Sequence, residues 1–122
     1  STPVKEQYRG DGVVSRAPGY GIQGIRVDGN DALAMYQAVS SARQLSLERS
    51  APVLVEAMTY RVGHHSTSDD WSRYRSSIEV KQWTSKDNPA KRLRLHLEGK
   101  GLWDMERDRS LRDMERVSVL KV

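Results

Sequence analysis

The feature that most constrains the fold is a short apolar run followed almost at once by a long polar stretch. Residues 52–58 read Pro-Val-Leu-Val-Glu-Ala-Met, and residues 60–76 contain two histidines, three arginines, two adjacent carboxylates and five Ser or Thr hydroxyls. The apolar run is typical of a strand buried on both faces of a parallel sheet. Burying so many polar groups of the second stretch without partners would cost too much free energy. We therefore predict a buried strand that leads into an exposed loop.

The residues before the apolar run predict a strand and a helix. Residues 22–27 have the pattern of a short strand, and the polar residues 28–31 form a turn. Asn30 is a good cap for a helix that runs to about Arg49, and Asp31 adds a carboxylate to its first turn. The expected buried side of this helix consists of Leu33, Tyr36, Val39, Ala42 and Leu45. A strand, a helix and a second strand in succession predict a right-handed βαβ unit.

Three helices are expected after the polar stretch. A capping-box pattern at residues 76–79 opens a helix through Trp83, and an Asn-Pro pair at residues 88–89 begins a second helix that ends near Gly99. Residues 104–122 form the third helix, whose apolar stripe is Leu111, Met114, Val117 and Leu120. The predicted fold class is α/β, a βαβ unit with parallel strands followed by carboxyl-terminal helices.

Charge and composition narrow the classes of function. The net charge is +4, and the excess of basic residues lies entirely within residues 80–122, where carboxylates are interspersed. A nucleic-acid surface more often forms a patch of one sign, so we interpret residues 81–121 as solvated helical faces. The absence of Cys excludes disulfides and thiolate metal sites. No apolar run approaches the roughly 18 residues of a membrane span, so no membrane partner is expected.

The polar loop holds the candidate functional residues. In open α/β sheets ligands gather at the carboxyl ends of strands, where His64 and His65 would lie. An imidazole exchanges a proton near neutral pH, so either histidine could act as an acid or base, although an exposed loop histidine without function fits the pattern too. Neighbouring histidines rarely point at one metal ion, and we predict no metal site here. The residues that could order the loop through charge-assisted hydrogen bonds are Arg61, Asp69, Tyr74 and Arg75.

Four stretches together resemble the alpha subunits of the branched-chain 2-oxo acid dehydrogenases. They are Glu-Gln-Tyr-Arg-Gly-Asp-Gly at 6–12, Gly-Tyr-Gly at 19–21, Ile-Arg-Val-Asp-Gly-Asn-Asp at 25–31 and Tyr-Arg-Val-Gly-His-His-Ser-Thr-Ser-Asp-Asp at 60–70. The resemblance runs from Ser1 to about Trp103. The paired histidines before Ser-Thr-Ser-Asp-Asp distinguish this pattern from that of the related pyruvate dehydrogenase alpha subunits.

The resemblance implies a carboxyl-terminal fragment of a decarboxylase that depends on thiamine diphosphate and Mg²⁺. Such an enzyme carries out the oxidative decarboxylation of branched-chain 2-oxo acids and transfers the acyl group to a lipoyl group. Residues 1–103 would be the carboxyl-terminal part of the thiamine diphosphate-binding domain, and residues 104–122 the start of a helical segment. Most ligands of the cofactor and metal would lie before Ser1, so the chain alone is expected to be inactive. Gly10-Asp11-Gly12 is interpreted as a loop turn and not as the family's metal and diphosphate motif.

The resemblance also implies roles for individual residues of the loop. His65 matches the family's histidine beside the cofactor, where it acts as an acid or base during transfer to the lipoyl group. Ser66 and Ser76 match serines that a dedicated kinase phosphorylates, Ser66 being the inhibitory site. Trp71 and Arg73 are bulkier than the family pattern. The residues that match the family's loop-ordering positions are Arg61, Asp69, Tyr74 and Arg75.

The implied partners are a beta subunit in an α2β2 heterotetramer, a lipoyl-bearing transacylase, the kinase and a phosphatase. The implied location is the mitochondrial matrix. The main alternative is a non-catalytic regulatory or assembly module that serves as a kinase substrate. Binding of nucleic acid through residues 81–121 is a third and weaker reading, which would show a steep loss of affinity with salt.

Overall fold

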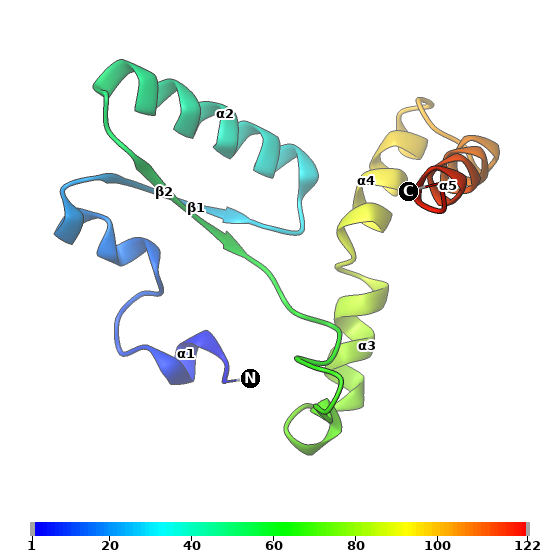
Figure 1. Ribbon diagram of the computed structural model, residues 1–122, viewed down its shortest axis with the longest axis horizontal. Coiled ribbons are helices and arrows are strands. Elements are labelled where there is room, and N and C mark those ends of the chain that lie inside the picture. Colours follow the sequence, from blue (N-terminus) through cyan, green and yellow to red (C-terminus); the bar gives the residue numbers. More distant parts are fainter. Residues whose placement is uncertain (1, 122) are drawn as a thin grey trace.

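The structure is a computed structural model that describes residues 2–121 (Figure 1). Its longer elements are β1 (Gln23–Asp28), α2 (Ala32–Arg49), β2 (Val53–Met58), α3 (Ser77–Ser85), α4 (Pro89–Gly99) and α5 (Met105–Val119). Its short elements are α1 (Val4–Gln7) and the 3-10 turns η1 (Val14–Arg16), η2 (Pro18–Tyr20) and η3 (Trp71–Arg73). Within the described range, no helix is both long and apolar enough to span a membrane.

The centre of the fold is a βαβ unit. Strands β1 and β2 pair in parallel, with Gln23 opposite Val53 and Asp28 opposite Met58. Helix α2 lies along one side of this pair and the segment before β1 lies on the other, while α3, α4 and α5 follow beyond the carboxyl end of β2 (Figure 1). The predicted α/β class, with parallel strands and carboxyl-terminal helices, is confirmed. The first strand begins and ends one residue later than expected.

The cap of α2 differs from the prediction by one residue. Asp31 is the N-cap, because its side chain accepts hydrogen bonds from the backbone N–H groups of Leu33 and Ala34, each at 3.0 Å. Asn30 is instead buried, with 6% of its surface exposed, and its Oδ1 accepts a hydrogen bond from the Thr59 hydroxyl at 2.7 Å. Asn30 therefore ties the turn before α2 to the residue that follows β2.

The prediction of the buried face of α2 was correct only in part. Ala42 is buried as expected and Leu45 is half-buried, but Leu33, Tyr36 and Val39 are 52%, 75% and 52% exposed. The other buried position of the helix is Ala38. The physical reason is that small side chains let the helix lie close to the two strands, so the larger apolar residues are on the outer face.

Contrary to the prediction, strand β2 is not buried on both faces. Val53 to Glu56 are half-buried, and Ala57 and Met58 are exposed. The face opposite α2 is covered by η1, since a Cβ on Gly24 would lie 2.7 Å from a methyl carbon of Val14. The sheet has only two strands in the described part of the chain, so neighbouring strands do not complete the burial of β2.

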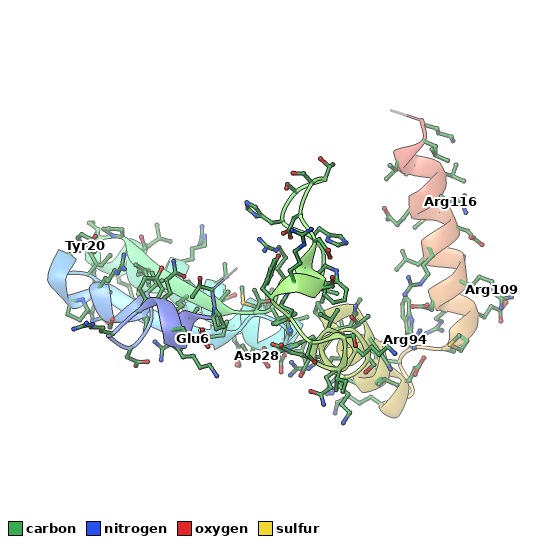
Figure 2. The ribbon with its side chains drawn as sticks, turned by 90° about the horizontal axis from the view of Figure 1, so that it is seen from below. Glu6, Tyr20, Asp28, Arg94, Arg109 and Arg116 are labelled. Carbon is green, nitrogen blue, oxygen red and sulfur yellow. The ribbon has the colours of Figure 1, made fainter. Side chains whose placement is uncertain are left out.

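The three carboxyl-terminal helices form as expected, although α5 has few neighbours. The predicted caps of α3 and α4 are confirmed, because Ser76 and Asn88 accept hydrogen bonds from backbone N–H groups of the first turns. Helix α5, which carries the labelled Arg109 and Arg116, stands apart from the sheet in Figure 2. Its expected apolar stripe faces solvent, with exposed side chains at Leu111, Met114, Val117 and Leu120.

Ion pairs connect α4 with the carboxyl end of β1 and with the N-cap of α2. The Arg92 guanidinium lies 2.7 Å from an Asp28 carboxylate oxygen at the end of β1, and 3.5 Å from a carboxylate oxygen of Asp31 and of Asp87. These contacts hold the pKa of the Asp28 carboxyl below its usual range, chiefly through the Arg92 hydrogen bond. Helix α4 is thereby fixed against the carboxyl end of the sheet, where the polar loop begins.

Candidate functional site

The polar loop leaves the carboxyl end of β2 and returns to α3. It rises away from the sheet near the centre of Figure 2. The 3-10 turn η3 divides it, and the Asp70 side chain caps this turn by accepting hydrogen bonds from the Ser72 backbone N–H at 3.1 Å and the Ser72 hydroxyl at 2.6 Å. The loop is exposed as predicted, but it has a dense set of internal contacts.

Asp69 connects the two halves of the loop. Its Oδ2 accepts hydrogen bonds from the His65 backbone N–H at 2.8 Å and from the Tyr74 hydroxyl at 2.6 Å. These two hydrogen bonds favour the ionised carboxylate, so the pKa of the Asp69 carboxyl lies below its ordinary value. The Asp69 backbone N–H in turn donates to the Ser66 carbonyl at 3.2 Å. Asp69 therefore closes the turn that contains His65 and Ser66.

The Arg61 side chain sets the chemical form of His65. Arg61 Nη1 lies 2.9 Å from His65 Nδ1. A guanidinium is always protonated and can only donate, so in the neutral imidazole Nδ1 accepts and Nε2 carries the proton. His65 is exposed. The neutral ring therefore presents its Nε2–H group to solvent as a hydrogen-bond donor, and only as an imidazolium can it give the Nε2 proton to a group that approaches the loop.

Arg75 holds the backbone that leads to the histidines. Its Nη1 donates to the Arg61 carbonyl and its Nη2 donates to the Gly63 carbonyl at 3.0 Å. Its guanidinium carbon also lies 5.3 Å from the Tyr60 ring centroid and 5.5 Å from that of Tyr74. The structure thus brings all four residues expected to order the loop into one network around His65, and their functional role remains a proposal.

The side chains of the two histidines have different neighbours. The His64 ring lies 6.0 Å from the Trp71 ring at a tilt of 34°, whereas His65 contacts Arg61. No cluster of three or more His, Asp or Glu side chains able to hold a metal ion occurs among residues 2–121. The described residues therefore do not fit a cradle for a metal-bound diphosphate.

The two candidate phosphorylation sites differ in their surroundings. Ser66 is exposed, and its Oγ lies 3.2 Å from the Ser68 Oγ. The Ser76 Oγ accepts hydrogen bonds from the backbone N–H groups of Ile78 and Glu79, each at 3.2 Å, so it caps α3. A change at Ser66 would act on the loop, whereas a change at Ser76 would act first on the helix.

Sequence analysis missed the aromatic contacts of the loop. The Tyr60 and Trp83 rings stack with centroids 5.0 Å apart and an angle of 4°, which fastens the start of the loop to α3. Trp71 is half-buried, while Arg73 remains exposed and forms only a 3.6 Å ion pair with Asp70. Aromatic residues spaced through an otherwise polar stretch were the available signal.

A cavity of about 470 Å³ beside the stack is lined by Thr2, Pro3, Val4, Thr59, Tyr60, Arg61, Tyr74, Arg75, Glu79 and Trp83.

Comparisons with known proteins agree on one family. The model of the family described as "Dehydrogenase E1 component" matches residues 1–119. The mitochondrial 2-oxoisovalerate dehydrogenase subunit alpha of Bos taurus is 54% identical over 99% of this chain and 27% of its own length. Subunit alpha 2 of Arabidopsis thaliana is 50% identical over 99% of this chain and 26% of its own length. The Dictyostelium discoideum subunit alpha is 57% identical over 84% of this chain and 24% of its own length. The chain thus spans about a quarter of these relatives.

Proposed function

The chain belongs to the dehydrogenase E1 component family, and from that membership we propose that it is part of a 2-oxoisovalerate dehydrogenase alpha subunit. The proposed reaction is the oxidative decarboxylation of branched-chain 2-oxo acids, with transfer of the acyl group to a lipoyl group. The names of relatives that are 50% to 54% identical support this reaction. The place of the chain within the longer subunit, expected to be carboxyl-terminal, stays a prediction, as does its division between residues 103 and 104.

The observation that carries the proposal is the ordered loop around His65. Arg61 fixes the tautomer of the imidazole at 2.9 Å, and Asp69 fixes its backbone at 2.8 Å. A positioned imidazole can donate a proton in a transition state. We assign His65 the role of the acid in transfer to the lipoyl group: its imidazolium form gives the Nε2 proton to a lipoyl sulfur as the disulfide of that group opens, and the ring is left neutral. The thiolate that would otherwise form is thereby neutralised.

The proposed cofactors are thiamine diphosphate and Mg²⁺. When bound, thiamine diphosphate would supply the nucleophilic carbon that decarboxylation of a 2-oxo acid requires. We place most ligands of the diphosphate and the metal outside this chain, as the family resemblance implies. This chain contributes the loop, with His65 next to the cofactor, and is inactive by itself.

The proposed partners follow from the subunit to which the chain is assigned. They are a beta subunit in an α2β2 heterotetramer, a lipoyl-bearing transacylase, and a kinase and phosphatase that act on Ser66 and Ser76. The relatives are named mitochondrial proteins, which supports a mitochondrial location, and we propose the matrix. Neither a nucleic acid nor a membrane is among the proposed partners.

The proposed regulation acts through charge. A phosphate on Ser66 would add about −1.5 to −2 charges next to His65. Asp69 lies close to Ser66, because the Asp69 backbone N–H donates a hydrogen bond to the Ser66 carbonyl at 3.2 Å. The negative phosphate would therefore repel the negative Asp69 carboxylate. Phosphorylation is therefore expected to disorder the loop and block the lipoyl group. A phosphorylated enzyme that kept full activity and a protease-resistant loop would contradict this mechanism.

The test of the function uses the full-length subunit assembled with its beta partner. We expect release of carbon dioxide from 2-oxoisovalerate that depends on added thiamine diphosphate, and much slower release from pyruvate. Assembly with the partners and phosphorylation of the loop without any turnover would instead favour the non-catalytic regulatory module.

A further inference from the structure

We propose that Trp71 is a positioning residue that completes an aromatic cage around the Arg75 guanidinium and so holds the backbone that presents His65. The cage consists of three rings, whose centroids lie 5.3 Å (Tyr60), 5.7 Å (Trp71) and 5.5 Å (Tyr74) from the guanidinium carbon. This inference deepens the proposed function and rests on it for its catalytic consequence. Its structural part stands on the contacts of the loop alone.

The Arg75 guanidinium depends on the three rings because no carboxylate among the described residues pairs with its charge. In the described part of the chain, no carboxylate forms an ion pair with Arg75. Its two terminal nitrogens donate to carbonyls, and its buried Nε has no hydrogen-bond partner among residues 2–121. The faces of aromatic rings carry partial negative charge and attract a cation within about 6 Å. The three rings therefore take the place of a carboxylate.

Two of the three rings are fastened by other contacts. Tyr60 is stacked on Trp83 of α3 with centroids 5.0 Å apart, and the Tyr74 hydroxyl donates to Asp69 at 2.6 Å. Both rings would stay in place if the third were removed. Replacing either of them would disturb α3 or Asp69 as well, so neither isolates the effect of the cage.

Trp71 is the ring that joins the cage to the histidines. The Trp71 ring centroid lies 5.7 Å from the Arg75 guanidinium carbon and 6.0 Å from the centroid of the His64 ring. The short 3-10 turn that carries Trp71 is capped by Asp70. The capped turn therefore fixes the backbone of Trp71, and a substitution of its side chain changes only the contacts of the ring.

A chain of contacts leads from the cage to the reactive imidazole. Arg75 donates to the carbonyls of Arg61 and Gly63, which lie on either side of Val62. The Arg61 side chain then contacts His65 Nδ1 at 2.9 Å. Loss of the Trp71 ring would let the Arg75 side chain move. The backbone of Arg61 would then lose its hydrogen bond from Arg75, and His65 would be less well positioned.

The test compares variants of the full-length subunit assembled with its beta partner. Trp71→Leu keeps an apolar side chain but removes the aromatic face, and Trp71→Phe keeps a face. Arg73→Ala is the matched control, because Arg73 belongs to the same turn and its side chain is 84% exposed. We expect Trp71→Leu to raise hydrogen exchange of residues 61–70 about fivefold, with Trp71→Phe and Arg73→Ala within about twofold of the wild type.

The same variants are then assayed for chemistry. Trp71→Leu should lower the rate of lipoyl acylation about fivefold and leave decarboxylation with an artificial acceptor unchanged, and Trp71→Phe should restore acylation. Wild-type exchange in Trp71→Leu, or equal loosening in Trp71→Leu and Trp71→Phe, would overturn the cage. Full acylation in Trp71→Leu beside a defective His65→Ala variant would overturn the positioning role. The expected exchange pattern with a fully active His65→Ala variant would support the cage and contradict the proposed role of His65.

Discussion

At the scale of residues, the order of the loop depends on the ionised carboxylate of Asp69. Its pKa lies below the ordinary value of 3.8, because the His65 backbone N–H and the Tyr74 hydroxyl donate to it. Because this pKa is lowered in the folded state, the ionised Asp69 carboxylate stabilises the loop fully above the ordinary pKa. This stabilisation is lost as pH falls through the folded-state pKa. We expect hydrogen exchange of residues 60–76, corrected for its intrinsic pH dependence, to rise below about pH 3.8. The variant Asp69→Ala should show fast exchange already at neutral pH, and equal protection in both proteins would contradict this assignment.

At the scale of elements, the segment before β1 is fixed to the sheet by Glu56 and needs glycine at position 12. The Glu56 carboxylate accepts from the Val13 and Val14 backbone N–H groups at 2.8 and 3.0 Å. Gly12 has a φ of +67°, and a Cβ there would lie 2.6 Å from Glu56 Oε1. Gly12→Ala should therefore lower the free energy of unfolding of the full-length subunit by about 2 kcal/mol in denaturant titration. Gly19→Ala is the control, since no atom lies within 4 Å of the added methyl group; equal effects of the two changes would refute the argument.

The elements also show what the sequence could and could not predict. The extents of β1, α2 and β2 were predicted almost to the residue, because apolar runs and turn residues mark them directly. The cap at Asp31 and the buried Ala38 were not predicted, since they depend on which face of α2 meets the strands. The position of the loop was predicted from its polarity, whereas the contacts of Trp71 required the folded chain. Spacing of large apolar residues identifies a helix face, but it does not tell whether that face meets this sheet or another surface.

At the scale of the whole molecule, the chain buries little of its surface. Its accessible area is 9704 Å², whereas a folded monomer of 13.8 kDa is expected to expose about 6,600 Å². The buried residues among those described are only Ala17, Asn30, Ala38, Ala42 and Val80. We therefore expect the isolated 122-residue chain to unfold without a cooperative transition in calorimetry and to bind a hydrophobic dye. A sharp transition with an enthalpy of the usual size for this length would contradict this expectation.

The central claim is that the loop presents His65 for acyl transfer, and paired alanine variants of the two histidines test it most directly. In the full-length subunit with its beta partner, His65→Ala should lower lipoyl acylation by about a hundredfold or more and spare decarboxylation with an artificial acceptor. The control His64→Ala should keep most of the acylation rate, because the His64 ring contacts Trp71 and not Arg61. Unchanged acylation in His65→Ala, or an equal loss in both variants, would contradict the account.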